Sequence, residues 1–389
     1  MRFTSKALKT KFLSSCERLR EGRLILRTPE GERYNFGTSG PEAEMVIRDW
    51  SVVPAMAAHG QVGLGETYVE GLWDTPSIET LMSVAMRNRD HLAAYDQASP
   101  LNRARFRLAD TLLRANSRRG ARRNIRAHYD VGNEFYALWL DEGMTYSSAL
   151  FDEPDSDLAR AQIRKNARIL SRLGSGGQVL EIGCGWGGFA EQAAQEGRDV
   201  TGITISRNQH SYADARLDGR ADIRLCDYRD IEGTYDNIVS IEMVEAVGAR
   251  YWPSYFSVLK HKLAGDGRAV LQAITVKDSF FPTYRTSSDY IRQYVFPGGM
   301  LLSDRVIRTQ AQQARLQVRN SFAFGQDYAR TCRIWAERLA ALRPRVLKMG
   351  YGEAFCRNWQ YYLEICAASF AVGHTNVVQV ELEHAPLHA

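Results

Sequence analysis

The sequence predicts an α/β protein in which helices cover both faces of a largely parallel β-sheet, preceded by a smaller α+β unit. Two observations support this fold class. From about residue 155 onward, short apolar runs alternate with helical patterns of about 10–15 residues, which is typical of parallel sheets. The chain also has 389 residues, more than one domain usually contains. We therefore expect a first unit at residues 1–100, an arginine-rich linker at 101–126 and a second unit at 127–389.

The first unit contains a predicted hairpin and several helices. Residues 24–36 are typical of a β-hairpin, because a Pro-Glu-Gly turn separates two alternating apolar runs. Helical patterns follow at residues 52–59 and 78–87. Between them, the glycines of residues 63–68 and 71–74 indicate a turn-rich packing element. No catalytic spacing occurs in this unit, so we expect it to contact lipid or a partner.

The second unit follows a regular alternation of strands and helices. Its expected elements are helix 158–173, strand 179–182, helix 189–194, strand 199–205, helix 209–217, strand 222–225, strand 237–241, a helix opened by Pro253 and strand 269–275. The last strand is expected to close the regular part. In such sheets ligands lie beyond the carboxyl ends of the strands. We therefore expect the site directly after Ile182, Ile205, Leu225, Ile241 and Thr275.

Two additions go beyond this regular alternation. Residues 276–300 are an aromatic-rich insertion, and two long helices are expected at 327–342 and 352–372. Insertions at the ligand-binding end of a sheet commonly form the substrate pocket, because loops carry function on a rigid scaffold. We expect the same role for these segments.

Residues 179–188 read Val-Leu-Glu-Ile-Gly-Cys-Gly-Trp-Gly-Gly and indicate the class of ligand. The apolar start suits a buried strand, the glycines allow a sharp turn, and the following helix presents N–H groups. The spacing also satisfies the G-x-G-x-x-G of dinucleotide folds, where an acid closes the second strand. Here the only acid of that strand, Asp199, opens it. Glu181 instead completes E-x-G-x-G-x-G, which places a carboxylate beside a cationic cofactor. This pattern favours S-adenosylmethionine over a purely structural turn.

Composition narrows the class of protein further. Apolar residues make up 44% of the chain and charged residues 24%, as in globular domains. No apolar run approaches the roughly 18 residues of a membrane-spanning helix, and residues 1–18 lack the apolar core of a signal peptide. No C-x-x-C pair or zinc spacing occurs among the cysteines, which are Cys16, Cys184, Cys226, Cys332, Cys356 and Cys366. We expect a reduced cytoplasmic protein without a structural metal.

Positive charge is concentrated in residues 103–126, although the net charge is only +5. One acid, Asp110, stands there against nine arginines, which are Arg103, Arg105, Arg107, Arg114, Arg118, Arg119, Arg122, Arg123 and Arg126. A solvated linker helix and a basic amphipathic surface that docks on anionic phospholipid headgroups both fit this pattern. Nucleic acid ranks third, because no nucleic-acid-binding module accompanies the arginines.

Several motifs, in a fixed order, resemble a known enzyme family. They lie at residues 128–136, 144–151, 179–188, 202–206 with Gln209, 227–230, 240–248 and 294–299. The most characteristic is Ser-Ile-Glu-Met-Val-Glu-Ala-Val-Gly at residues 240–248. Residues 125–385 are thereby similar to cyclopropane-fatty-acyl-phospholipid synthases and mycolic acid methyltransferases. The resemblance implies a Rossmann-like class I methyltransferase sheet with helical insertions. The first hundred residues match the longer, phospholipid-acting members in position more than in motif.

The resemblance also implies which residues bind S-adenosylmethionine. They are Glu181, Gly183 and Gly185 for the methionine part, with Cys184 and Gly187 in the same turn, Thr204 and Gln209 for the ribose, Asp227 and Tyr228 for the adenine, and Tyr146 and Ser147 as cover. Neutral hydrogen-bonding groups thus replace the usual acid at the ribose. For Tyr146, a plain core tyrosine is the competing interpretation.

The reaction implied by the resemblance starts from an unsaturated phospholipid acyl chain. Its alkene attacks the sulfonium methyl, and a carbocation forms beside the new carbon. Loss of a proton then gives a cyclopropane or a methylated alkene, and hydride addition gives a methyl branch. Such a site must be dry, apolar and lined by aromatic faces. The insertion at 276–300 and the rings of Tyr328, Trp335 and Tyr361 supply them.

Members of that family hold a bicarbonate ion as proton acceptor. In this sequence its ligands map to the side chains of Glu245 and Tyr328 and to the backbone of Ile274. Two positions depart: Ser148 stands where the family has cysteine, and Gln272 where it has histidine. Both still donate hydrogen bonds, so bicarbonate stays compatible with the site. The loss of imidazole favours a methyl-branched or methyl-alkene product over a cyclopropane.

Several alternatives stay open. Glu242 and Glu245 follow a strand end, where a buried structural pair competes with a catalytic one. N-methylation of a small amine is a second enzyme function, because plant amine N-methyltransferases share Ser-Ile-Glu-Met-x-Glu. The preceding unit and Ala246, where those enzymes tend to carry histidine, argue against it. A non-catalytic, cofactor-binding partner of a lipid-modifying enzyme is the third function. We expect peripheral association with the inner face of the membrane, and a homodimer is compatible with the sequence.

Overall fold

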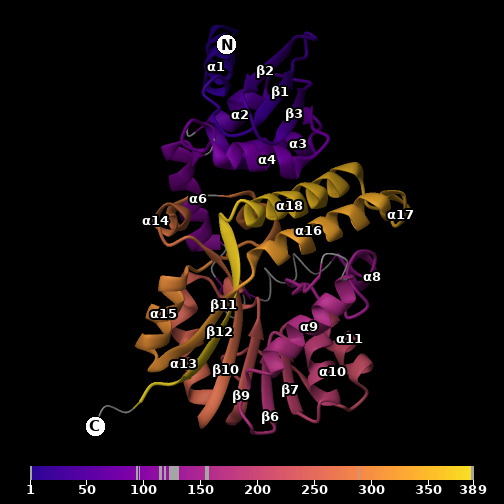
Figure 1. The fold of residues 1–389 in the computed structure, drawn as a ribbon, viewed down its shortest axis with the longest axis vertical. Helices are drawn as coiled ribbons and strands as arrows, with labels where there is room; N and C mark the ends of the chain where they lie inside the picture. The colour runs from indigo at the N-terminus through magenta and orange to yellow at the C-terminus, as the bar shows by residue number, and fades with distance from the viewer. Residues whose placement is uncertain are drawn as a thin grey trace. The chain divides into compact units, whose positions relative to one another are not determined.

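The computed structural model (Figure 1) describes residues 2–92, 95, 97–113, 116–117, 120–121, 131–153, 157–287 and 289–386. The chain forms two compact units. The first consists of Met1–Leu112, Thr283–Val295 and Cys332–His374, and the second of Leu113–Pro282, Phe296–Thr331 and Thr375–Ala389. Each unit therefore combines segments that are distant in the sequence, whereas the sequence-based division is continuous. None of the helices in the described ranges is long and apolar enough to cross a bilayer.

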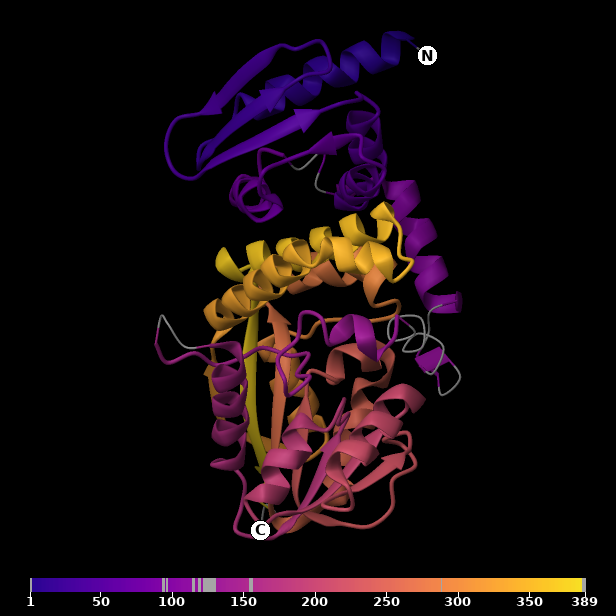
Figure 2. The same ribbon diagram turned by 90° about the vertical axis from the view of Figure 1, so that its right-hand side faces the viewer.

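A four-stranded sheet with the order β2-β1-β3-β4 organises the first unit (Figure 2). Its strands are β1 (Arg23–Arg27), β2 (Arg33–Gly37), β3 (Glu42–Ile47) and β4 (Trp73–Asp74). β1 and β2 are antiparallel, with Leu24 opposite Phe36, so the predicted hairpin is confirmed. β3 runs parallel to β1 on the other side.

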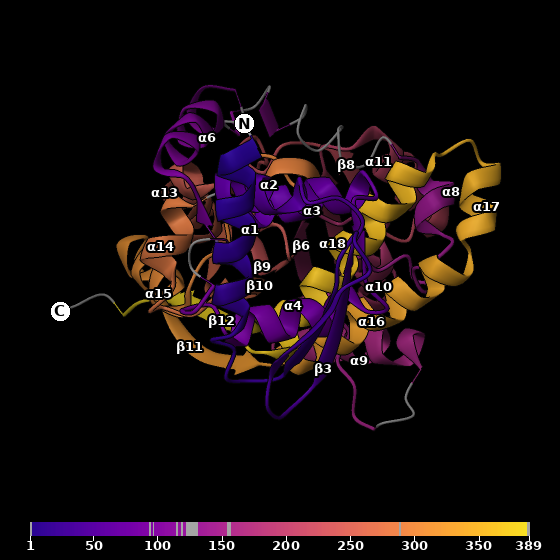
Figure 3. The same ribbon diagram turned by 90° about the horizontal axis from the view of Figure 1, so that it is seen from above.

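Helices complete the first unit. They are α1 (Arg2–Cys16), α2 (Val52–His59), α3 (Gln61–Val69), α4 (Ile78–Arg87), α6 (Pro100–Leu113), the π-helix η2 (Ile291–Val295), α17 (Arg343–Lys348) and α18 (Glu353–Ala371), with a two-residue strand β5 (Gln97–Ala98). One core joins the sheet to α1, α2 and α4 (Figure 3). The helices predicted at 52–59 and 78–87 are confirmed as α2 and α4.

The turn-rich element predicted at residues 63–68 is wrong, because these residues lie in α3. A Cβ on Gly63 would lie 2.3 Å from the Ala55 carbonyl oxygen of α2. A Cβ on Gly65 would lie 2.3 Å from the ring of Tyr290. The two glycines therefore allow close packing of a helix and do not make a turn.

A seven-stranded sheet with the order β11-β12-β10-β9-β6-β7-β8 organises the second unit. Its strands are β6 (Gln178–Ile182), β7 (Asp199–Thr204), β8 (Asp222–Leu225), β9 (Tyr235–Ile241), β10 (Leu263–Val276), β11 (Leu316–Ala323) and β12 (Thr375–His384). Neighbours from β8 to β10 pair in parallel, whereas β12 is antiparallel to both its neighbours. The predicted α/β class with a largely parallel sheet is confirmed.

The sheet does not close with strand 269–275, as the sequence analysis expected. β12 pairs along β10, with Gln379 opposite Gln272, and β11 adds to β12. Between β11 and β12 the sequence contains α16 (Gly325–Ala341), α17 and α18. A search for local alternation therefore missed both strands, because their pairing joins distant parts of the chain.

Helices flank the seven-stranded sheet on both sides (Figure 1). They are α8 (Asn133–Tyr136), α9 (Leu158–Leu170), α10 (Gly188–Gln195), α11 (Arg207–Leu217), α12 (Val244–Val247), the 3-10 helix η1 (Ala249–Tyr251), α13 (Trp252–Lys262) and α15 (Asp304–Gln313). A further helix, α14 (Phe281–Thr286), begins in this unit, but its residues from Thr283 onward belong to the first. Pro253 lies in the first turn of α13, as expected. Because β6 to β10 are parallel, the loops after these strands meet at one end of the sheet.

Candidate active site

β6 ends in the glycine turn that the sequence predicts. The N–H groups of Gly183 and Cys184 both donate to the Ile203 carbonyl, at 2.9 and 3.0 Å, which ties the turn to β7. Gly183, Gly185 and Gly187 have φ angles of 86°, 54° and 84°, which favour glycine. Gly187 caps α10, so the unpaired N–H groups of that helix's first turn lie beside the loop. The turn thus offers backbone donors at the carboxyl end of β6.

Glu181 is a buried carboxylate on β6 with an unsatisfied oxygen. Its side chain is 2% exposed, and Oε2 has no hydrogen-bond partner among the described residues. Burial raises the pKa of Glu181 to about 8, against the opposing effect of the Lys165 ammonium. An unsatisfied buried oxygen is costly unless a ligand satisfies it. Together with the glycine turn, Glu181 fits the cationic amino or sulfonium end of S-adenosylmethionine.

Two neutral side chains, one at the end of β7 and one in the first turn of α11, lie where dinucleotide folds carry an acid. Thr204 Oγ1 donates to Gln209 Oε1 over 2.9 Å, and both side chains are buried. Ser206 caps α11 by accepting the N–H of Gln209. The structure therefore brings the two predicted ribose-binding residues together.

Asp227, two residues after β8, forms an ion pair within the chain. Its carboxylate accepts hydrogen bonds from Nη2 and Nε of Arg229, at 2.6 and 2.8 Å. The same guanidinium lies 5.2 Å from the centre of the Tyr228 ring. Burial raises the pKa of Tyr228 to about 12, so its ring stays neutral. The sequence analysis did not single out Arg229, although its position two residues after an acid was a signal.

Tyr146 and Ser147 belong to the segment between α8 and α9. The Tyr146 ring lies 5.5 Å from that of Tyr136 and 5.4 Å from that of Trp139, measured between centroids. Ser147 is buried, and its hydroxyl oxygen accepts a hydrogen bond from Nζ of Lys165 at 3.1 Å. Aromatic contacts and this buried lysine thus fix the segment against the sheet.

Lys165 is a residue of the site that the sequence analysis missed. It projects from the buried face of α9, is 1% exposed and lies near the carboxylates of Glu242, Asp141 and Glu181. Burial lowers the pKa of Lys165 to about 8, and the three carboxylates oppose this decrease. The sequence did contain a signal for it, namely a lysine at a core-facing position of an amphipathic helix. Because lysines are rarely buried without a charged partner, that position indicates carboxylates nearby.

Glu242, directly after β9, receives three hydrogen bonds on its side chain. Its Oε1 accepts from the backbone N–H of Ser148 at 2.9 Å and from Nε2 of Gln272 at 2.7 Å. Its Oε2 accepts from the hydroxyl of Tyr328 at 2.5 Å. The backbone of Glu242 has a φ of 51°, in the left-handed region that residues other than glycine rarely adopt. Strained backbone of this kind clusters at functional sites.

The amide of Gln272 is oriented by two residues that the sequence analysis also missed. Its Oε1 accepts from Nε2 of Gln379 on β12 at 2.9 Å, and Oε1 of Gln379 accepts from Arg168 at 3.2 Å. Because the carbonyl of Gln272 faces β12, its NH2 group faces Glu242. The three residues come from distant segments, so no local pattern indicated them.

Glu245 lies at the start of α12, beside Glu242. Its Oε1 accepts the N–H of Ile274 at 2.5 Å, while Oε2 has no hydrogen-bond partner in the described part of the chain. Burial, and then the Glu242 carboxylate, raise the pKa of Glu245 to about 8. Burial also raises the pKa of Glu242, but its three donors and a nearby ammonium act in the opposite direction. Of the two side chains, Glu242 is therefore the one held as a carboxylate.

The five predicted bicarbonate ligands do not fit an external anion. Three of them direct their donors at Glu242, and the N–H of Ile274 is directed at Glu245. The hydroxyl of Ser148 donates to the carbonyl of Ala149 at 3.0 Å. A further anion would lie against the Glu242 carboxylate, which like-charge repulsion disfavours. The expected bicarbonate site is thus replaced by side chains of the chain itself.

Two rings expected in the substrate lining lie in the first unit. Tyr361 belongs to its core, with ring centroids 5.5 Å from Tyr68 and 4.8 Å from Tyr290. Trp335 is fully buried in the same unit. Tyr328 lies in the second unit and contacts Glu242. The expected aromatic lining thus stays a prediction, with Tyr328 the member of this trio that the structure places beside Glu242.

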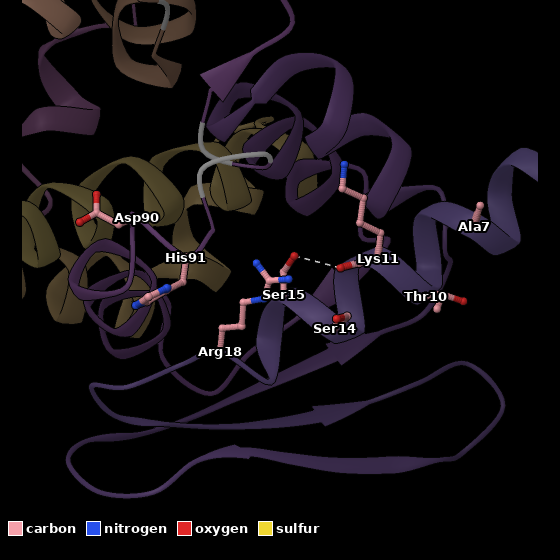
Figure 4. A pocket seen from close by; sticks show the side chains of 8 residues that line it. All are labelled: Ala7, Thr10, Lys11, Ser14, Ser15, Arg18, Asp90 and His91. Atoms are coloured by element: carbon pink, nitrogen blue, oxygen red, sulfur yellow. Dashed lines mark hydrogen bonds between the residues drawn. The ribbon is translucent and has the colours of Figure 1, made fainter.

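Metal-binding groups, disulfides and further hollows would mark other candidate sites among the described residues. In the described ranges, no three His, Cys, Asp or Glu side chains are grouped so that they could hold a metal. All six cysteines are free thiols. A hollow of about 610 Å³ lies in the first unit (Figure 4). Its lining comes from α1 and from the turn after α4, namely Ala7, Thr10, Lys11, Ser14, Ser15, Arg18, Asp90 and His91. It contains no pair of carboxylates comparable to that of the second unit.

Known proteins resemble this chain over most of its length. A family model described as mycolic acid cyclopropane synthetase matches residues 116–380. The tuberculostearic acid methyltransferase UfaA1 of Mycobacterium tuberculosis is 35% identical over 377 residues, covering 92% of this chain and 87% of that protein. The cyclopropane-fatty-acyl-phospholipid synthase of Escherichia coli is 33% identical over 344 residues, which cover 87% of each protein.

Solved structures agree with these relatives. The mycolic acid cyclopropane synthase CmaA1, complexed with SAH and CTAB, superposes with a TM-score of 0.63 at 28% identity, covering 67% of this chain and 97% of that one. Family model, relatives and fold thus coincide with a glycine turn and a buried glutamate suited to a sulfonium cofactor. The chain belongs to the mycolic acid cyclopropane synthetase family and is an S-adenosylmethionine-dependent methyltransferase.

Proposed function

We propose that the protein methylates carbon–carbon double bonds in the acyl chains of unsaturated phospholipids. The observation that supports this most directly is the pair of partly buried glutamates, Glu242 and Glu245, at the carboxyl end of β9. Methylation of an alkene creates a carbocation, which gives a methyl-alkene or a cyclopropane when it loses a proton, and the carboxylate of this pair supplies an acceptor for that proton. The two relatives above are named for fatty acid and phospholipid substrates, which also supports the assignment.

In this proposal the residues around the glycine turn hold the cofactor. The bound cofactor supplies an electrophilic methyl group. Glu181 faces its cationic end because the unsatisfied Oε2 gains a charged partner there. The remaining binding residues are Gly183, Cys184, Gly185 and Gly187 at the methionine part, Thr204 and Gln209 at the ribose, Asp227 and Tyr228 at the adenine, and Tyr146 and Ser147 as cover.

We assign the product as a methyl-alkene or methyl-branched acyl chain rather than a cyclopropane. Gln272 and Ser148 replace the histidine and cysteine of the resembling family, and they bind Glu242 instead of an external anion. The relative with 35% identity is named for tuberculostearic acid and the one with 33% identity for a cyclopropane product. Both kinds of product can form from the same carbocation, so analysis of the lipid product distinguishes them.

We place the membrane-docking surface on α6. Leu101 and Leu108 are 62% and 61% exposed, and Arg105, also exposed, lies between them on the same helical face. Phe106 points to the opposite face and is buried near the Arg292 guanidinium. Exposed leucines beside a guanidinium suit an interface with anionic lipids, which would hold the protein at the inner face of the membrane.

The docking surface proposed on α6 contains one arginine of the arginine-rich segment, Arg105. Outside the described residues lie Arg114, Arg118, Arg119, Arg122, Arg123 and Arg126, and the side chains of Arg103 and Arg107 are not described. Residues 128–130 of the entry motif also lie outside the described residues. Lipid or partner binding by residues 1–100, and a homodimer, stay predictions.

Lipid analysis of a host that expresses the chain tests the proposal. We expect unsaturated acyl chains to gain the mass of one CH2 group in a methyl-alkene, or of CH4 in a methyl-branched chain, for which a separate hydride donor must be present. Nuclear magnetic resonance of the extracted chains should show an olefinic or branched methyl signal. Upfield cyclopropane methylene protons would instead assign the other product. Methylated small amines with unchanged acyl chains would contradict the proposal in favour of N-methylation.

A further inference from the structure

We propose that the Glu242 carboxylate is the proton acceptor of the methyl transfer and fills the place of an external anion, so that the reaction needs no bicarbonate. This inference rests on the proposed function and adds the group that removes the proton. Glu242 follows β9 at the carboxyl ends of the parallel strands, where ligands of such sheets bind.

The hydrogen bonds of Glu242 leave one acceptor position unused. An ionised carboxylate offers about four lone-pair positions, two on each oxygen. Oε1 accepts from Ser148 and Gln272, and Oε2 accepts from Tyr328. No other side-chain hydrogen bond reaches Glu242 from the described residues, so Oε2 retains a lone pair. We therefore assign Oε2 as the atom that receives the proton.

The donors around Glu242 are arranged for a permanent anion. The N–H of Ser148 is part of the backbone and does not change rotamer. The amide of Gln272 is locked by Gln379, which occupies its carbonyl. Donors that are fixed before the reaction stabilise a charge without reorganisation. They would serve an external anion equally well, but here they are occupied by a side chain.

Charges nearby support the same assignment. Lys165, the buried ammonium on α9, is attracted by Glu242 and offsets its charge. Glu245 is the member of the pair that retains its proton, because its Oε1 has one donor and its Oε2 none among the described residues. Glu242 is thus available to take a proton from the substrate, and a second anion beside the pair is disfavoured.

The chemical step balances without a further reactant. Methyl transfer to one alkene carbon leaves a cation on the neighbouring carbon of the acyl chain. A C–H bond beside the cation breaks, its electron pair forms a C=C bond, and the proton passes to Oε2 of Glu242. The product is a methylated alkene, and Glu242 becomes a carboxylic acid that returns its proton to water before the next turnover. No oxidant or reductant is consumed.

Two substitutions of Glu242 separate this inference from a structural role. Glu242→Gln keeps the size of the side chain and removes its basicity. Glu242→Gly suits the φ of 51° and leaves space for a small anion. Glu196→Gln, at an exposed position after α10, is the matched control. The full-length chain is assayed with S-adenosylmethionine and vesicles of unsaturated phosphatidylglycerol, in CO2-free buffer with and without sodium bicarbonate.

We expect wild-type turnover to be the same with and without bicarbonate. Glu242→Gln should lower kcat by about 100-fold or more, the usual contribution of a general base, and bicarbonate should not restore it. Glu242→Gly should lose a similar amount, and bicarbonate should restore part of it. Calorimetry should show unchanged cofactor affinity in both variants, which establishes that they fold.

Binding of carbon-13-labelled bicarbonate gives a readout that does not depend on turnover. Nuclear magnetic resonance should detect binding to Glu242→Gly and none to the wild type. Stoichiometric binding to the wild type, wild-type turnover that requires bicarbonate, or full activity of Glu242→Gln would each overturn the inference. If no variant methylates the vesicles but all bind the cofactor, the proposed function fails, while the labelled bicarbonate still reports whether Glu242 fills the anion position.

Discussion

Gln272 donates from Nε2 to Oε1 of Glu242 over 2.7 Å, and its own Oε1 accepts from Gln379 at 2.9 Å. Turning this amide by half a revolution would set its carbonyl against the carboxylate and its NH2 group against the NH2 group of Gln379. Both hydrogen bonds would be lost in a buried site, where unpaired polar groups are costly. The glutamine therefore presents a donor to Glu242 at all times.

Gln272→Met should lower kcat by about 10- to 100-fold, because a hydrogen bond to a charged group contributes about 1.5–3 kcal/mol. Cofactor affinity should stay unchanged, since Gln272 contacts Glu242 and not the glycine turn. Gln379→Leu should act in the same direction but less, because the donor survives and only its orientation is freed. Steady-state kinetics and calorimetry measure the two quantities. An equal loss of cofactor affinity would point to a general disturbance of the sheet instead.

Glu181→Gln should weaken binding of S-adenosylmethionine and abolish its pH dependence. In the free protein Glu181 has a pKa of about 8, and a cationic ligand favours its carboxylate, so binding releases a proton. Wild-type affinity should therefore rise as the pH increases toward about 8 and level off above it. Titration calorimetry in buffers with different heats of ionisation measures the released proton. Identical pH profiles for wild type and variant would remove Glu181 from the cofactor site.

Glu245→Gln should stabilise the fold more at pH 8 than at pH 5. The pKa of Glu245 is raised from 4.5 to about 8, so the folded state binds an extra proton between these values. Wild-type stability from this group is present at low pH and is lost as the pH rises through the window. Each pH unit contributes at most about 1.4 kcal/mol. Glu242 and Tyr255, which face Glu245, remain in the variant. Denaturant unfolding at both pH values measures the difference, and a pH-independent difference would contradict the assignment.

Lys165→Met should destabilise the second unit by about 3 kcal/mol or more at pH 7, because it removes the ammonium from a cluster of carboxylates. The carboxylates of Glu181, Glu242 and Asp141 would lose the ammonium that opposes their burial. Arg160→Met on the exposed face of the same helix is the control and should change stability by less than about 0.5 kcal/mol. Chemical denaturation compares the two. Equal effects would mean that Lys165 acts through packing of its alkyl chain alone.

Leu101→Ser combined with Leu108→Ser should reduce sedimentation with anionic vesicles, and addition of Arg105→Ser should remove most of the remaining salt dependence. Each basic side chain near such a surface contributes about 1 kcal/mol. Ile163→Ser, at an apolar position of α9 that is 58% exposed, is the control and should leave vesicle binding unchanged. Cofactor affinity should be the same in all variants. Vesicle binding that is insensitive to these leucines would place the docking surface elsewhere.

The sequence correctly predicted the elements that are determined by residues adjacent to one another in the chain. The glycine turn after Ile182 and the strand at residues 222–225 depend on neighbouring residues, and both were found where expected. β12 could not be predicted in the same way, because its pairing with β10 joins segments separated by β11 and by the helices from α14 to α18. Lys165 was missed for a different reason: its partners are carboxylates on other elements, and the helix pattern alone marks its position as core.

In the candidate site, too, the sequence did not predict contacts between residues that are distant in the chain. From residue types and motif order we expected Ser148, Gln272 and Tyr328 to surround a bicarbonate ion. In the structure they donate to the Glu242 side chain. The sequence contained two glutamates at the right strand end, and only the backbone conformation of Glu242 distinguishes which one the donors reach. Motif order thus identified the set of groups, whereas side-chain direction required the fold.

The place of β12 in the sheet also sets the order in which the protein matures. Its Gln379 lies opposite Gln272 only after the C-terminal segment has inserted beside β10, a contact between residues far apart in the sequence, and such contacts form slowly. A nascent chain that ends before β12 contains every predicted catalytic residue, yet it lacks the group that orients the donor to Glu242. Competence for catalysis is therefore acquired only after β12 has left the ribosome and paired with β10.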